Sequence, residues 1–113
     1  MTIMNLINEF RQSCGKEPVK YWNRVLDDHC LSHTLFMINS GQVDHAPKYY
    51  LGHYDEIVWR CDFMNTWDET FRYLIFELIG KSEKHKKILL ESQELGYGVM
   101  SDKNKVFITI RGR

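Results

Sequence analysis

Five histidines stand out in this sequence, because imidazole titrates near neutral pH and is the commonest metal ligand. They lie at positions 29, 33, 45, 53 and 85. His29 and His33 have the i, i+4 spacing that lets two imidazoles share one helix face and hold one metal ion. The glutamate of an HExxH motif is missing, because Cys30 follows His29. Both histidines fall on the apolar face of a helical pattern, where hydrogen-bonded core histidines are the simpler interpretation.

A second group of chemically capable residues is spread along the chain. His45 and His53 lie in a loop region, where binding groups collect on a rigid scaffold. His85 follows Ser82, a candidate N-cap, so the helix dipole favours its neutral, ligand-competent form. Glu56 opens a predicted strand on its polar face, where it could hydrogen-bond an imidazole or act as a general base. The alternative is that all of these are solvated loop residues.

The sequence contains no nucleophile elbow, phosphate-binding glycine loop or dinucleotide motif. The three cysteines, Cys14, Cys30 and Cys61, are widely spaced, which is unlike a disulfide framework or a zinc knuckle. Cys61 alternates with Ile57 and Trp59, which predicts a core thiol. Reduced thiols and the lack of a signal-peptide pattern at the N-terminus predict a cytoplasmic protein.

Apolar periodicity predicts the elements that would position these residues. Helices are expected over residues 4–14, 21–40, 66–80 and 82–90, a strand over 56–62, and a C-terminal hairpin that turns at 101–104. The helix over 21–40 is apolar on both sides, which predicts burial between two layers. Thr66 and Glu69 form a capping box. This order of elements favours an α+β fold with helices on both faces of the sheet.

Length and composition limit the functional classes. The 113 residues, 43% hydrophobic and 13% aromatic, predict a single domain over 1–113 with a real core. Fifteen basic residues balance fifteen acidic ones, so general nucleic-acid binding is not expected. No run approaches the roughly 18 to 20 apolar residues that span a bilayer, so the chain is not expected to be transmembrane.

The order of these landmarks resembles the CAP superfamily of cysteine-rich secretory proteins, venom antigens and plant pathogenesis-related proteins, and is most similar to its short bacterial members. The resemblance covers nearly the whole chain. It is carried by Asn8-x-x-Arg11, Gly15, Pro18-Val19, Leu26, Cys30, His33, Met37, His45, Glu56, Ser82-x-x-His85, Leu89-Leu90, Gly96-Tyr97-Gly98-Val99 and Thr109. It implies a three-layer α/β/α sandwich with a mostly antiparallel sheet.

The resemblance also implies a cleft. His45, Glu56 and His85 match three members of the family's tetrad of two histidines and two acidic residues, and Glu77 is the candidate for the fourth. By this resemblance the two histidines can hold a divalent ion such as Zn²⁺. The chain departs from the family pattern in having Ile57 after Glu56, where asparagine is usual, and in lacking the family's disulfides and export signal.

Three functions follow as hypotheses. The favoured one is a binding module whose cleft, between residues 41–55 and His85, accepts a small ligand, lipid or peptide. The first alternative is a zinc-assisted hydrolase, with His45 and His85 holding the metal and Glu56 as base. The second alternative is a protein–protein interaction module that docks through the loop tyrosines. These are Tyr49, Tyr50 and Tyr54.

Overall fold

A four-stranded sheet forms the middle layer of the molecule. The structure, a computed structural model, describes residues 2–113. The strands lie in the order β1-β3-β4-β2; β1 pairs in parallel with β3, and the other pairs are antiparallel. They are β1 (Tyr21–Trp22), β2 (Asp55–Asp62), β3 (Glu94–Asp102) and β4 (Lys105–Gly112).

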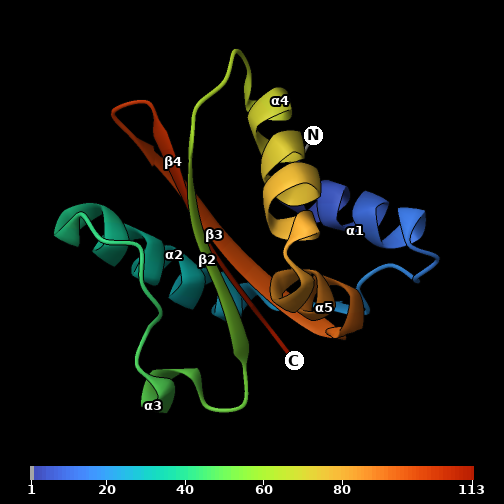
Figure 1. The fold of residues 1–113 in the computed structure, drawn as a ribbon. Coiled ribbons are helices and arrows are strands. Elements are labelled where there is room, and N and C mark those ends of the chain that lie inside the picture. The colour runs from blue at the N-terminus through green and yellow to red at the C-terminus, as the bar shows by residue number, and fades with distance from the viewer. Residues whose placement is uncertain (1) are drawn as a thin grey trace.

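Helices cover both faces of this sheet. One face carries α2, and the other carries α1, α4 and α5 (Figure 1). The helices are α1 (Ile3–Ser13), α2 (Arg24–Ser40), α3 (Lys48–Leu51), α4 (Trp67–Arg72) and α5 (Glu83–Glu91). The predicted α+β, α/β/α sandwich with a mostly antiparallel sheet is therefore confirmed. None of the helices over residues 2–113 has the length and apolar content to cross a membrane.

The apolar core fills the space between the sheet and the helices α1, α4 and α5. The predicted alternation is confirmed in β4, where Val106, Ile108 and Ile110 are fully buried, and Thr109 between them contacts Thr34 of α2 on the other face. The largest fully buried members of the core are Ile3, Leu6, Ile7, Ile57, Leu74, Ile75, Ile79, Leu89, Leu95, Ile108 and Ile110. Because strand side chains alternate between faces, this core on one side fixes which residues meet α2 on the other.

Capping and turn residues in the sequence predicted most ends of the helices and strands correctly. The Thr66 hydroxyl accepts a hydrogen bond from the Glu69 backbone N–H at 3.1 Å, which is one half of the predicted capping box, whereas the Glu69 carboxylate accepts from the Asn65 side-chain amide at 3.5 Å. The helix then continues as a π-helical segment, η1 (Tyr73–Leu78), and a 3₁₀ turn, η2 (Ile79–Lys81). Ser82 is the N-cap residue of α5, but its side chain makes no capping hydrogen bond.

The prediction for residues 21–40 was wrong in two respects. Tyr21 and Trp22 form strand β1, and Asn23 caps α2 by accepting a hydrogen bond from the Leu26 N–H at 3.1 Å. The helix is also not buried between two layers. It buries the face that carries Leu26, Cys30, Thr34 and Met37, whereas Val25, Leu31, Leu35 and Phe36 are exposed. Apolar periodicity alone could not show that only one side of α2 has a neighbouring layer.

The helix α2 approaches the sheet closely because β3 carries glycine beneath it. A Cβ atom on Gly98 would lie 2.3 Å from the backbone nitrogen of Leu31. Thr34, which is fully buried, then lies with its hydroxyl 2.8 Å from the Gly98 carbonyl and 2.9 Å from the Thr109 hydroxyl. This contact fixes the position of α2 on the sheet, and with it the side chains that face residues 44–50.

Candidate functional site

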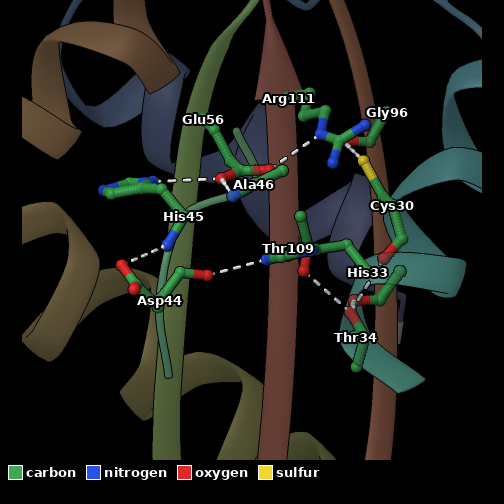
Figure 2. A network of polar contacts seen from close by, with 11 residues as sticks. Cys30, His33, Thr34, Asp44, His45, Ala46, Glu56, Gly96, Thr109 and Arg111 are labelled. Carbon is green, nitrogen blue, oxygen red and sulfur yellow. Dashed lines mark hydrogen bonds and ion pairs between the residues drawn. The ribbon is translucent and has the colours of Figure 1, made fainter. Parts of the chain in front are cut away.

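The carboxylate of Glu56 is the centre of a buried polar network beneath α2 (Figure 2). Its side chain is 1% exposed. Oε2 accepts a hydrogen bond from Arg111 Nε at 2.8 Å, and Oε1 accepts one from the Ala46 backbone N–H at 2.9 Å. His45 Nδ1 lies 3.0 Å from the same Oε1. Both oxygens of Glu56 are therefore engaged, and the predicted proximity of His45 and Glu56 is present.

This network determines which ring nitrogen of His45 carries the hydrogen in the neutral imidazole. A carboxylate paired with a guanidinium accepts hydrogen bonds and does not donate them, so the His45 Nδ1 must carry the hydrogen. In the neutral ring this leaves Nε2 unprotonated and able to accept a hydrogen bond or bind a metal ion. The His45 side chain is 47% exposed, so this nitrogen belongs to a ring that solvent reaches.

Sequence reasoning missed Arg111. In the β2–β4 register Arg111 lies directly opposite Glu56, and both side chains point away from the apolar core. A signal was present, because Ile108 and Ile110 were predicted to face the core, which places Thr109 and Arg111 on the opposite face. A charged residue on a face that a helix covers needs an opposite charge beside it, and Glu56 supplies it.

The two histidines of α2 lie beside the same network, but not as core residues. His33 is half-buried, and its Nε2 lies 2.7 Å from the carbonyl oxygen of Asp44. His29 is exposed, so the interpretation of both as core histidines was wrong for this residue. His53, the other loop histidine, is exposed as well. The contact between His33 and Asp44 connects α2 to the segment that carries His45.

His85 lies on the opposite side of the sheet from α2. Its ring packs edge-on against Trp59, with 5.4 Å between the ring centroids, and its buried Nδ1 has no hydrogen-bond partner among residues 2–113. Burial lowers the pKa of His85 below its ordinary value, and the charges of His45 and Lys84 lower it further. A neutral His85 was expected from the helix dipole, whereas here burial is the first cause.

We expect His85 to make folding pH-dependent. Because its pKa is lower in the folded than in the unfolded chain, the unfolded chain binds the proton more tightly. Stability should therefore be greatest above the ordinary histidine pKa of about 6.5 and fall as the pH drops below it. In urea denaturation between pH 7.5 and 5, a His85→Gln variant should lose less stability than the unmodified protein. His53→Gln, which removes an exposed imidazole, should keep the full loss, and equal slopes for His85→Gln would contradict the prediction.

A cavity of about 590 Å³ lies between α2, residues 45–50 and β4. Its lining residues are His29, Ser32, His33, Phe36, His45, Ala46, Pro47, Tyr50 and Arg111. The wall is mainly apolar and aromatic, and the polar groups of His45 and Arg111 meet at it. His85 is not among the lining residues, so this cavity opens from His45 toward α2, whereas the hypothesised cleft lay between residues 41–55 and His85.

Comparison with known proteins identifies the fold. No protein-family model matches the sequence, and no curated protein matches it. Among solved structures, Na-ASP-1 matches 96% of this chain with a TM-score of 0.70 at 11% identity. An extracellular protein containing a SCP domain, from Bacillus anthracis, matches 98% of it with a TM-score of 0.69 at 18% identity. The chain has the CAP fold. An outer surface protein from Borrelia burgdorferi matches 98% of it, with a TM-score of 0.69 at 11% identity.

These structural neighbours differ in length from this chain. The matched region is 37% of Na-ASP-1, 39% of the Bacillus protein and 89% of the Borrelia protein. At these identities the likeness establishes the CAP fold, and function has to be argued from the site. Two of these neighbours are described as extracellular or as an outer surface protein, so the cytoplasmic location of this chain stays a prediction from its sequence.

The metal that the CAP resemblance implies can be tested against the side chains present. Among residues 2–113, no three His, Cys, Asp or Glu side chains are gathered closely enough to hold a metal ion. Glu56 is engaged with Arg111, and Glu77 is exposed and pairs with Lys81 at 3.3 Å. A catalytic zinc centre uses three protein ligands, and residues 2–113 gather no such set. The residues therefore do not fit a catalytic zinc site.

Proposed function

We propose that this CAP domain is a binding module whose ligand occupies the cavity between α2, residues 45–50 and β4. The observation that carries the proposal is the cavity itself, about 590 Å³ in volume. Sites for small ligands usually have volumes of about 300–1,000 Å³, with mostly apolar walls and a few convergent polar groups. Here Phe36, Pro47 and Tyr50 supply apolar wall, and His45 and Arg111 supply the polar groups.

Exposed aromatic rings at the cavity support the same function. Phe36 is 64% exposed and Tyr50 is 69% exposed, and both line the cavity. Contiguous exposed apolar patches mark binding surfaces more often than scattered single residues do. Each aromatic ring in such a patch can bury a large area when a ligand binds. Tyr49 extends this surface, with its ring centroid 4.6 Å from that of Tyr50. A small ligand, a lipid chain or a peptide with an apolar side chain would cover these rings.

Binding has more support than the alternative of a zinc-assisted hydrolase. That alternative needs Glu56 as a base, but its two oxygens already accept hydrogen bonds from Arg111, Ala46 and His45. A thiol nucleophile is also disfavoured, because burial raises the pKa of Cys30 to about 12. Neither Glu56 nor Cys30 is therefore in a state that favours catalysis.

The second alternative is docking of a partner protein through loop tyrosines. Fewer tyrosines are free for such docking than the sequence indicated. The hydroxyl of Tyr54 donates to the Glu94 carboxylate at 3.1 Å, and the Arg113 guanidinium lies over its ring. Tyr54 is therefore fixed within the domain. The exposed rings of Tyr49 and Tyr50 remain, and they border the cavity proposed for the ligand.

We expect a substitution that fills the cavity to weaken ligand binding strongly. Ser32 is exposed and lines the cavity from α2, so Ser32→Trp places a large ring there and replaces no member of the Glu56 network. Ligand-detected NMR with a set of lipids, small acids and peptides should give signals with the unmodified protein and weaken them at least about tenfold in the variant.

Ser101→Trp, on the exposed end of β3, is the matched control and should bind as the unmodified protein does. Both variants should keep the thermal midpoint of the unmodified protein within a few degrees. Absence of any bound compound, or binding that survives Ser32→Trp, would rule out this cavity as the ligand site.

A further inference from the structure

Arg111 has hydrogen-bonding capacity that the folded chain does not use. The residue is 6% exposed, and the bond it makes to Glu56 uses Nε. Among residues 2–113 neither of its Nη atoms has a hydrogen-bond partner, yet neither is enclosed, since the one enclosed side-chain atom left unpaired there is His85 Nδ1. Arg111 lines the cavity, and its two Nη groups are the part of the guanidinium that the bond to Glu56 leaves unused.

A buried guanidinium with unpaired donors favours an acceptor from outside the chain. A guanidinium presents its N–H groups as a rigid fork, and hydrogen bonds to an ionised acceptor are about twice as strong as those between neutral groups. The ion pair with Glu56 fixes the orientation of this fork, so little side-chain entropy would be lost when a ligand binds. The geometry points to a carboxylate of the ligand, accepted by the Nη groups of Arg111, and this inference rests on the proposed function.

The charge beside Arg111 favours a singly charged group. Glu56 already carries one negative charge 2.8 Å from the Arg111 Nε, so a ligand anion enters a pair that is close to neutral. Repulsion from Glu56 grows with the charge of the ligand, and a doubly charged phosphate would therefore be penalised more than a carboxylate. A carboxylate also matches the planar guanidinium in two parallel hydrogen bonds.

The cavity wall indicates what is attached to that carboxylate. Phe36, Pro47 and Tyr50 supply apolar wall to the same cavity that Arg111 lines. The ligand class is therefore a monocarboxylate with an apolar body. Two sources share this chemistry, namely the C-terminus of a peptide with an apolar last residue and a free fatty acid.

Comparing each acid with its amide separates what the ligand's charge contributes to binding from what its apolar body contributes. N-acetyl-phenylalanine and octanoate represent the two sources, and N-acetyl-phenylalaninamide and octanamide are their uncharged counterparts. Titrations into ¹⁵N-labelled protein should show at least one acid binding about tenfold more tightly than its amide, and should shift the Arg111 Nε–H resonance. Which acid binds identifies the source.

Arg111→Lys keeps a positive charge for Glu56 but removes the fork, so it should weaken binding of the acid about tenfold and leave the amide unchanged. Arg24→Lys makes the same change at an exposed position on α2 and should have no effect. If Arg111→Lys does not fold, the acid–amide comparison in the unmodified protein decides. Acid and amide binding equally would overturn the inference. The proposed function would then stand if Ser32→Trp still blocked both, whereas no binding by any compound would remove both proposals.

Discussion

Replacing Arg111 with methionine should lower the free energy of unfolding by about 3–5 kcal/mol, because breaking a buried ion pair leaves the other charge without compensation. Glu56 would keep the Ala46 N–H and His45 Nδ1 as donors, but its charge would remain in a site where its side chain is 1% exposed. Urea denaturation at pH 7 measures the loss. The double variant Glu56→Met with Arg111→Met should recover much of it, since both charges are then removed.

A matched control for this prediction lies two residues beyond Arg111, just after the end of β4. Arg113 donates from its Nε to Glu94 Oε1 at 2.8 Å, the same donor atom and distance as in the Arg111–Glu56 pair. The Arg113 side chain is 51% exposed, however, so water already solvates the charge. Arg113→Met should therefore cost far less stability than Arg111→Met. Equal losses in the two variants would mean that burial of the Glu56 charge is not what makes this pair important.

Several residues on which the family resemblance was based hold helices and strands in place, and they lie away from the cavity. The Asn8 side chain accepts a hydrogen bond from the Val19 N–H at 2.9 Å, which holds the chain after α1. Arg11 donates from Nη1 to the carbonyls of Leu89 and Ser92, at 2.7 and 3.0 Å, where α5 ends. Because such residues fix the fold directly, an ordered set of them predicted the α/β/α sandwich without an alignment.

The candidate site was less predictable than the fold, for a physical reason. The proximity of His45 and Glu56 was expected from the resemblance, but Arg111 was not, because strand register decides which residue lies opposite Glu56. The shape of the cavity depends on how α2 lies across the sheet, and apolar periodicity in the sequence does not predict that placement. The burial of His29 was wrongly predicted for the same reason, because α2 packs against a layer on one side only.

Gly98→Ala should be among the most destabilising single-methyl substitutions in the chain. Its Cβ would lie 2.3 Å from Leu31 N, 2.4 Å from Leu31 Cα and 2.7 Å from Cys30 C, all backbone atoms that cannot turn away. Added methyl groups in a packed interior cost about 1–3 kcal/mol, and we expect the upper end here because α2 itself must move off β3.

The consequence of Gly98→Ala would extend beyond stability, because the same approach places Thr34 on the Gly98 carbonyl and His29 and Ser32 at the cavity. Thermal unfolding should show the loss of stability, and the ligand titration should show weaker binding in the fraction that still folds. Gly112→Ala is the comparison, since its Cβ would meet the side chains of Leu95 and Ser92, at 2.3 and 2.6 Å, which can rotate aside. If Gly98→Ala were no worse than Gly112→Ala, the close seating of α2 on β3 would not be what sets the shape of the cavity.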